Sequence, residues 1–259
     1  MNIIADTHLH SSFSCDAKDS IEDLVQQAIR NRLTYLCLTE HIDYNPLDYG
    51  YDFFKYEEYS QEIDRMRDKY SGDITILKGL EFSEPHLYKA EFALECARDY
   101  DMMMAGLHWL DDHFYGEKRL LDKYSPQQIM DHYLADLAQV VEIPGIDVIA
   151  HFDFPHRYFG AIDSRNRRIK NVLTKIADKG MALEINTSGF RKGYPHTLPG
   201  FEILEQYREC GGRRVTIGSD AHQKEHIGAD FDKAYSLLKT FNLEYGLFIN
   251  KRWVPLNFY

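Results

Sequence analysis

Histidine and acidic side chains follow one predicted strand after another along this chain. The set comprises Asp6, His8, His10, His41, Glu81, His108, His151, Asp220 and His222. Imidazole nitrogens and carboxylate oxygens bind zinc, manganese and iron, and these ligand types do not discriminate among the three metals. The donors outnumber the four positions around one tetrahedral ion. The sequence therefore predicts a centre with more than one divalent transition-metal ion.

The first candidates belong to the segment Asp-Thr-His-Leu-His at residues 6–10. Side chains two residues apart point to the same side of an extended segment, so His8 and His10 can direct two imidazoles at one ion. Asp6 shares that side and is either a further ligand or a partner that orients a histidine. Either histidine alone would also fit a strand end that bonds only to backbone.

The other candidates come directly after short apolar runs, where a buried strand would end. They are His41, Glu81, His108, His151, and Asp220 with His222 two residues later. Any one of them could be structural, but their recurrence in series indicates a shared site. The two oxygens of Glu81 could bridge two ions. Asp16, in a loop of small polar residues, is either a ligand or an ordinary cap or turn residue.

Strand and helix patterns alternate along the chain and would position these residues. Apolar runs predict strands at 2–5, 33–39, 74–80, 102–107, 146–150, 181–186 and 214–218. Helical periodicity predicts helices between them, at 20–29, 55–70, 87–98, 126–142, 165–179, 199–210 and 230–241. Such alternation gives a closed barrel or an open doubly wound sheet, and the lack of a GxGxxG turn after the first strand favours the barrel. Strand ends of a barrel converge at one mouth. The aromatic tail at 243–259 is expected to pack across the barrel.

Length and composition favour one domain over residues 1–259, because 44% hydrophobic residues can fill a large core. The net charge of −11 disfavours a nucleic-acid binder and favours a small-molecule substrate. The basic stretch from Arg165 to Lys170 is typical of a solvated helix face. The cysteines at 15, 37, 96 and 210 show no zinc spacing and fit a reducing compartment. Without a signal-peptide pattern or a membrane-spanning apolar run, we expect a cytoplasmic protein that binds no membrane.

These motifs resemble the polymerase-and-histidinol-phosphatase (PHP) superfamily. The resemblance runs from residue 3 to residue 222 through DxHxH (6–10), EH (40–41), GLE (79–81), the strand-end His108 and His151, and SDAH (219–222). The segments HSSFSCDA and NTSGFRKGYPH are similar to the histidinol-phosphate phosphatase branch. The resemblance implies an α/β fold, a distorted (βα)7 TIM-like barrel, with three divalent metal ions at the carboxyl ends of its strands.

The resemblance also implies how the ions are held. The first ion would bind His8, His10, Glu81 and Asp220. Glu81 would bridge to the second ion, which His108 and His151 complete. The third ion would bind Asp16, His41 and His222.

A centre of this kind predicts hydrolysis of a small phosphomonoester. Bound metal lowers the pKa of water from 15.7 to roughly 7, so a metal-bridging hydroxide would be available to attack phosphorus in line. We expect Glu81, Asp220 and His222 to act in catalysis. Arg157 and Arg191 would hold the phosphate, although each could instead be an ordinary exposed arginine, and Lys192 and His196 are weaker candidates. The acid for the leaving alkoxide is left open among His222, Asp153 and His86.

The substrate that the resemblance implies is L-histidinol phosphate, whose ammonium and imidazole groups suit carboxylates and aromatic faces. Loop residues of these kinds are Asp43, Tyr44, Glu84, Trp109, Tyr115, Tyr158 and Phe190. The alternative is another phosphoesterase of the superfamily, acting on phosphotyrosyl protein, a nucleotide or another small phosphate ester. The acidic charge disfavours a nuclease, and the complete ligand set disfavours a non-catalytic metal-binding protein. The sequence does not indicate the native metal or the oligomeric state.

Overall fold

The computed structural model describes residues 4–160 and 166–257, and its main sheet has nine strands. In sheet order they are β1 (Ala5–Asp6), β2 (Tyr35–Ile42), β3 (Thr75–Ser83), β4 (Met102–Gly106), β7 (Val148–Ile149), β8 (Ala182–Asn186), β9 (Arg214–Gly218), β10 (Glu244–Ile249) and β11 (Arg252–Pro255). Neighbours from β1 to β10 are parallel, and β11 is antiparallel to β10. The seven predicted strands are confirmed, although residues 2 and 3 of the first predicted range lie outside the described residues.

The first and seventh of these strands meet, so the parallel sheet curls into a barrel. Leu9, just after β1, forms a parallel bridge with Ala221, just after β9. The backbone N–H of Thr7 donates to the carbonyl of Ile217 at 3.1 Å. Because parallel strands in a ring end on one side, the segments that follow them surround one mouth.

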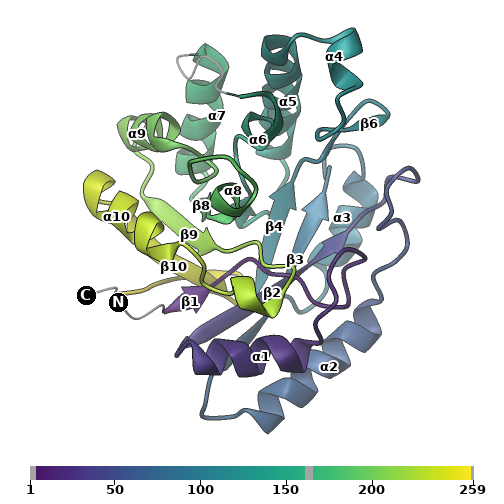
Figure 1. Cartoon of the computed structure of the whole chain (residues 1–259), viewed down its shortest axis with the longest axis vertical. Coiled ribbons are helices and arrows are strands. Elements are labelled where there is room, and N and C mark those ends of the chain that lie inside the picture. The colour runs from purple at the N-terminus through teal and green to yellow at the C-terminus, as the bar shows by residue number, and fades with distance from the viewer. Residues whose placement is uncertain (1–3, 161–165, 258–259) are drawn as a thin grey trace.

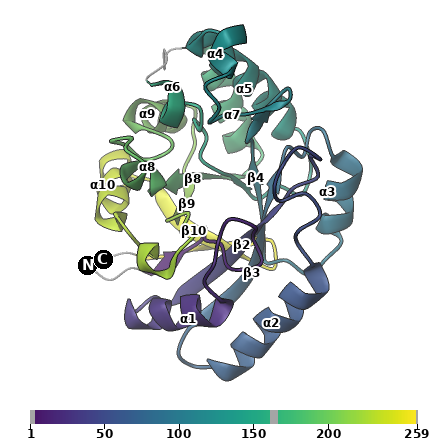
Figure 2. The ribbon, with the colours of Figure 1, turned by 45° about the vertical axis from the view of Figure 1, so that its right-hand side comes forward.

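Helices cover the outside of the strands (Figures 1 and 2). The longer ones are α1 (Ile21–Arg30), α2 (Tyr56–Lys69), α3 (Lys89–Cys96), α5 (Pro126–Val140), α7 (Arg167–Asp178), α9 (Phe201–Glu209) and α10 (Phe231–Phe241). Each predicted helix is therefore present, with α7 starting two residues later than expected. Within residues 4–160 and 166–257, we find no helix with the length and apolar character needed to cross a bilayer.

Shorter elements lie in the loops that follow the strands. They are β5 (Trp109–Leu110), β6 (His113–Phe114), α4 (Leu120–Lys123), α6 (His156–Phe159), α8 (Ser188–Arg191) and a 3-10 turn at Lys224–His226. Of the basic stretch, Arg165 lies outside the described residues, whereas Arg167, Arg168 and Lys170 are exposed on α7. The solvated face predicted there is confirmed for these three residues.

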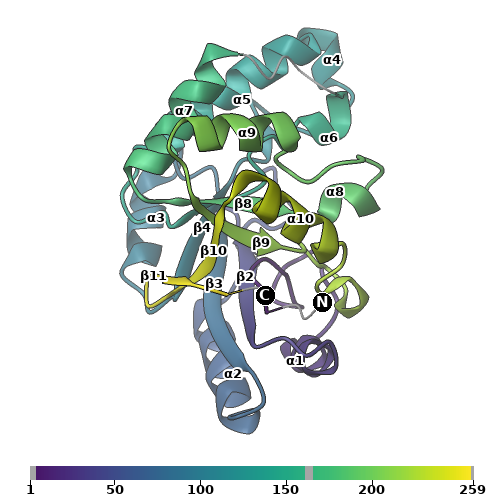
Figure 3. The same cartoon turned by 90° about the vertical axis from the view of Figure 1, so that its left-hand side faces the viewer.

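The tail crosses the barrel, as predicted, but it does so as a strand pair (Figure 3). β10 starts beside β9, and the turn that follows it reaches the start of β4, where the backbone N–H of Asn250 donates to Asp101 at 3.0 Å. Asn250 and Lys251 both have left-handed φ, at +49° and +59°. Two such residues form a tight hairpin turn, in which glycine usually takes the second position. Because Lys251 occupies the second position, no glycine marks this hairpin among the residues of the turn.

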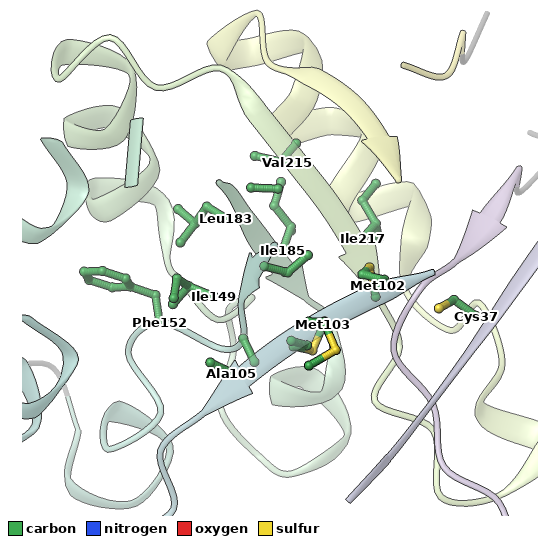
Figure 4. Packing of buried hydrophobic residues seen from close by; sticks show 14 of the residues in the cluster. Cys37, Met102, Met103, Ala105, Ile149, Phe152, Leu183, Ile185, Val215 and Ile217 are labelled. Atoms are coloured by element: carbon green, nitrogen blue, oxygen red, sulfur yellow. The ribbon is translucent and has the colours of Figure 1, made fainter. Parts of the chain in front are cut away.

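Buried apolar side chains from successive strands fill the interior (Figure 4). Those that the view labels are Cys37, Met102, Met103, Ala105, Ile149, Phe152, Leu183, Ile185, Val215 and Ile217. Burying one side chain of the Leu, Ile or Met type contributes roughly 1.5–3 kcal/mol, so this core is the rigid frame behind the mouth. Cys37 is in the core as expected, and Cys96 is half-buried. The single domain over residues 1–259 stays a prediction.

Candidate metal centre

The nine predicted ligands meet at the carboxyl ends of the strands. Three groups have ligand atoms within 4.8 Å of one another: His8, His10 and Asp220; Glu81, His108 and His151; and His10, His41 and His222. Asp16 joins the third group, because its Oδ2 lies 2.9 Å from Nε2 of His222. The segments that supply these residues are far apart in the sequence, and only the barrel brings them together.

The first group has the spacing of metal ligands. Nε2 of His8 lies 3.1 Å from Nε2 of His10 and 3.1 Å from Oε2 of Glu81, and Nε2 of His10 lies 3.7 Å from Oδ1 of Asp220. Bonds of about 2.0–2.1 Å from zinc to nitrogen or oxygen place tetrahedral ligand atoms roughly 3.3 Å apart. Two ring nitrogens that face each other at 3.1 Å cannot both be protonated, because the two N–H groups would repel each other. A cation between them would bind both lone pairs.

Glu81 lies between the groups and presents one oxygen to each side. Its Oε1 lies 2.8 Å from Nε2 of His151 and 3.6 Å from Nε2 of His108. Its Oε2 faces His8 and also lies 3.2 Å from Nδ1 of His41. This is the arrangement that a bridging carboxylate requires. The third group is the most open, because Asp16 is 51% exposed while Glu81 is 1% exposed.

Glycines make room for ligands at two strand ends. A Cβ on Gly106 would lie 2.6 Å from Oε1 of Glu81, and a Cβ on Gly218 would lie 2.3 Å from both Oε1 of Glu184 and Cβ of His8. Two of the candidate ligands also have left-handed backbone, since His151 has a φ of +26° and Asp220 one of +53°. Residues other than glycine adopt such values at a cost, and they do so most often at functional sites.

Partners behind three of the candidate ligands favour one ring nitrogen as the atom that faces the centre. Nδ1–H of His8 donates to Oε1 of Glu184 at 2.6 Å, which leaves Nε2 of His8 free as a ligand atom. The other oxygen of Glu184 accepts the backbone N–H of His151 at 2.8 Å. Nδ1 of His108 lies 3.1 Å from the hydroxyl of Ser83, and Nδ1 of His222 donates to the carbonyl of Asp220 at 3.1 Å.

Glu184 is the functional residue that the sequence reasoning missed. It is fully buried within β8, between Leu183 and Ile185. An acidic residue inside an otherwise apolar strand is the signal that could have identified it, because a buried carboxylate requires a partner. Asp6, for which two roles were open, accepts the backbone N–H groups of Ser219 and Gly228, each at 2.9 Å. It therefore joins segments around the site.

Neighbouring positive groups keep two of the carboxylates ionised. Burial opposes the ionisation of Glu81, but His8 and His41 hold the pKa of Glu81 well below its usual value. Burial also opposes the ionisation of Asp220, and Lys192 and His8 likewise lower its pKa. Burial, together with His41, lowers the pKa of His10. Anionic carboxylates and a neutral imidazole are the forms that bind metal.

A cavity of about 880 Å³ opens above the ligands, and two of the predicted cationic residues, Arg157 and Lys192, line it. Arg157 donates to the hydroxyl of Ser188 at 2.6 Å and lies 3.6 Å from Oδ2 of Asp220, while its Nε is buried without a hydrogen-bond partner among the described residues. Arg191 is not among the lining residues, and its guanidinium donates to the carbonyl of Ser219. His196 lies on the exposed surface outside the lining.

The three candidates for the acid lie in different places. His222 lines the cavity, with its Nε2 facing Asp16. Asp153 is buried and accepts from Nδ1 of His156 at 2.9 Å, and His86 lies 3.7 Å from Asp136. Neither Asp153 nor His86 belongs to the cavity lining.

The predicted substrate contacts also separate into two sets. Asp43, Trp109 and Tyr158 line the cavity, as do Leu47, Asp48, Tyr49, Phe53 and Phe114. Tyr44, Glu84, Tyr115 and Phe190 do not. Burial raises the pKa of Glu84 to about 7, and its Oε1 accepts the backbone N–H of His108 at 2.5 Å. Glu84 therefore supports the wall of the cavity from behind.

Comparison with known proteins gives a consistent result. The family model described as PHP domain matches residues 6–188. The chain is 34% identical over 242 residues to the probable histidinol-phosphatase of Thermotoga maritima, covering 93% of each protein. It is 31% identical over 246 residues to the histidinol-phosphatase of Lactococcus lactis, covering 90% of each. Among solved structures it resembles the histidinol phosphate phosphatase from Lactococcus lactis complexed with zinc, L-histidinol and phosphate, with a TM-score of 0.88, 25% identity, and coverage of 97% of this chain and 98% of the other.

Proposed function

The chain belongs to the PHP family, and from that premise we propose that it hydrolyses L-histidinol phosphate to L-histidinol and inorganic phosphate. The enzyme is a phosphoric monoester hydrolase. Support comes from relatives named histidinol-phosphatase that match nearly the whole chain, and from the similar structure that holds L-histidinol and phosphate. The observation that carries the proposal is the convergence of nine potential metal ligands at the strand ends, seven of which line one cavity.

The cofactors are divalent metal ions, and the spacing of the donor atoms fits them. We propose three ions, of zinc, manganese or iron. His8, His10, Glu81 and Asp220 would hold the first ion, Glu81, His108 and His151 the second, and Asp16, His41 and His222 the third. When bound, such ions lower the pKa of a coordinated water toward neutrality and offset charge on phosphoryl oxygens.

The chain's own residues would orient the ester. Arg157 lines the cavity, so its guanidinium could bind a phosphoryl oxygen. Lys192 provides a second positive charge on the same side of the cavity, close enough to Asp220 to lower the pKa of that carboxyl. Glu184 keeps His8 in one tautomer, so that its Nε2 stays directed at the centre.

Of the three candidates for the acid that protonates the leaving alkoxide, His222 is the one that lines the cavity. Its Nδ1–H is donated to the carbonyl of Asp220, so Nε2 is the atom directed at Asp16. That nitrogen can hold a proton or an ion, but not both. The two roles predicted for His222 therefore exclude each other at any one moment.

Turnover of a panel of phosphomonoesters, before and after metal removal, tests the proposal. We expect kcat/KM for L-histidinol phosphate to exceed that for p-nitrophenyl phosphate by at least a hundredfold. Prolonged dialysis against a chelator should abolish turnover, and added Zn²⁺ or Mn²⁺ should restore it, because the charge offset by metal contributes several kcal/mol to transition-state stabilisation. Full activity in protein shown to be metal-free by elemental analysis would contradict the metal-dependent mechanism, and equal rates on both esters would contradict the substrate.

A further inference from the structure

Asp16 differs from the other candidate ligands in how the chain holds it. The others lie at strand ends or soon after them, whereas Asp16 lies in a loop and is 51% exposed. His10 does not replace it in the third group, because Nδ1 of His10 lies 3.3 Å from the hydroxyl of Ser14 and Nε2 of His10 faces His8. The third group then keeps two imidazoles and the Asp16 carboxylate. Because a loop holds a ligand less precisely than a strand end does, binding of a third ion depends on this loop.

Two consecutive turns carry Asp16, and Ser14 belongs to both of them. The backbone N–H of Ser14 donates to the carbonyl of Ser11 at 2.8 Å, and the carbonyl of Ser14 accepts the backbone N–H of Ala17 at 3.3 Å. Asp16 lies in the second turn, between Ser14 and Ala17. Surface segments that are held mainly by local backbone bonds open more easily than core elements do. A movement of Ser14 would therefore move Asp16.

Glu40 joins these turns to strand β2. It is fully buried, and the hydroxyls of Ser11 and Ser14 both donate to its carboxylate, each at 2.6 Å. The backbone N–H of Ser11 lies 3.1 and 3.0 Å from the two oxygens of the same carboxylate. All of these donors belong to residues 11–14, so the buried carboxylate is satisfied by this loop and fixes it to the sheet.

The hydroxyl of Ser14 also contacts two candidate ligands. Besides donating to Glu40, it accepts the backbone N–H of His41 at 3.0 Å and lies 3.3 Å from Nδ1 of His10. A hydroxyl has one hydrogen and two lone pairs, so these three contacts use its full capacity. Nδ1 of His10 is then the donor, which leaves Nε2 of His10 as a ligand atom. One hydroxyl thus connects the loop of Asp16 with ligands of the first and third groups.

We infer that Ser14, anchored by Glu40, is a positioning residue for Asp16 and determines whether the third ion binds. This inference rests on the proposed function and on its three ions. Without the hydroxyl, the turn that carries Asp16 would lose its attachment to β2, whereas Glu81, Asp220 and the histidines at the strand ends would keep theirs. Affinity for the third ion should therefore fall more than affinity for the other two.

Ser14→Ala removes the hydroxyl, and metal binding measures the result without turnover. Equilibrium dialysis against Zn²⁺ buffers of defined free concentration, followed by elemental analysis, gives the number of ions per chain and their dissociation constants. We expect three ions in the parent protein. In Ser14→Ala the Kd of one ion should rise about 10- to 100-fold, and the Kd values of the other two should stay within about threefold. Ser12→Ala is the matched control, because Ser12 is an exposed serine of the same loop, and it should leave all three values within about twofold.

Asp16→Asn identifies the ion that is affected, because it weakens a ligand of the third ion directly. If Ser14 acts through Asp16, adding Ser14→Ala to Asp16→Asn should change the Kd of that ion by less than about threefold, since both substitutions affect one interaction. A full further rise in the double variant would mean that Ser14 acts elsewhere, and an equal rise for all three ions in Ser14→Ala would mean that it supports the fold. Either result would overturn the inference.

Further results separate the inference from the proposed function. Three unchanged dissociation constants in folded Ser14→Ala would overturn the inference alone. A parent protein that binds at most two ions at saturating Zn²⁺ would overturn the third ion and this inference, whereas a fully loaded parent without turnover of L-histidinol phosphate would overturn the proposed substrate.

A second variant keeps the test open should Ser14→Ala fail to fold, as judged by circular dichroism. Phe13 packs edge to face against Tyr59, with ring centroids 5.7 Å apart, and this contact helps to hold the loop. Ser11→Ala removes the other hydroxyl that donates to Glu40 and leaves the bonds of Ser14 in place. It should raise the Kd of the third ion by about 3- to 10-fold, the effect of one hydrogen bond. An unchanged value would overturn the inference.

Discussion

Charged side chains are buried at both ends of the barrel, but they are satisfied in different ways. At the amino end, Asp101 accepts from the backbone N–H of Lys78 at 2.9 Å, from Arg67 at 2.6 Å and from the backbone N–H of Asn250 at 3.0 Å. At the carboxyl end, ring nitrogens of different histidines face one another, and within the described residues Nδ1 of His151 is buried without a hydrogen-bond partner. Complete pairing indicates a structural role, and incomplete pairing indicates a site that awaits a ligand.

Hydrogen bonds at the amino end also hold the tail across the barrel. Besides Asn250, the side chain of Lys251 donates to the carbonyl of Cys96 at 2.6 Å, and its backbone N–H donates to the carbonyl of Asp101 at 2.8 Å. These bonds join the β10–β11 turn to the segment between α3 and β4. Asp101 thus connects three chain segments, whereas Glu81 connects the groups of candidate metal ligands.

The largest effect that this comparison predicts is on stability at the amino end. Asp101→Ala leaves Arg67 and two backbone N–H groups without their acceptor, so the free energy of unfolding should fall by about 3 kcal/mol. Urea denaturation followed by circular dichroism measures it, with Asp68→Ala, an exposed aspartate on α2, as the control. Because Asp101 is remote from the cavity, kcat/KM should stay within twofold of the parent value. A loss of activity in the folded variant would contradict the division of roles between the two ends.

A smaller effect is expected when a partner of the carboxyl-end ligands is changed. Glu184→Gln keeps the shape but removes the charge that orients His8 and accepts the N–H of His151, so zinc affinity should fall about 10- to 100-fold. Competition with a chromophoric chelator measures the dissociation constants, and Glu205→Gln on the exposed side of α9 is the control. An unchanged affinity would mean that Glu184 serves the fold rather than the metal centre.

The candidate ligands other than Asp16 could be predicted from the sequence because they follow apolar strands. Register in a parallel sheet follows from such runs, and the pairing of His41 with Glu81 across β2 and β3 shows how this aligns the ends. A glycine two residues before each of Glu81, His108 and Asp220 also indicates the end of a strand. The residues of the site that lie at strand ends can therefore be predicted from short segments of the sequence.

The walls of the cavity could not be predicted in the same way, because they depend on contacts between loops. The bond from Trp109 to Asp48 joins residues 61 positions apart, and no spacing rule relates them. Likewise, Lys192 lines the cavity while its neighbour Arg191 turns to the carbonyl of Ser219, although the sequence favoured the arginine. The geometry of the short helix α8 determines which of the two adjacent side chains faces the cavity. A helix of four residues is too short to show a periodic pattern in the sequence.

The smallest predicted effect concerns an incompletely paired charge at the amino end. Asp147, just before β7, accepts the backbone N–H of Met103 at 2.9 Å, and burial raises the pKa of Asp147 to about 6. The folded state thus prefers the protonated acid. The stability that this group contributes is complete below its unfolded pKa of about 3.9 and is lost as the pH rises through about 6.

Asp147→Asn should remove that loss, because the amide oxygen can accept the same N–H without a charge. We expect the variant and the parent to be equally stable at pH 4 and the variant to be more stable by about 1 kcal/mol at pH 8, measured by urea denaturation at both values. A variant that is less stable at pH 8 would mean that the charge itself is needed, through Lys251. A gain would sharpen the comparison, because neutralising an incompletely paired carboxylate would then help at the amino end, whereas the carboxylates at the other end must stay ionised to bind metal.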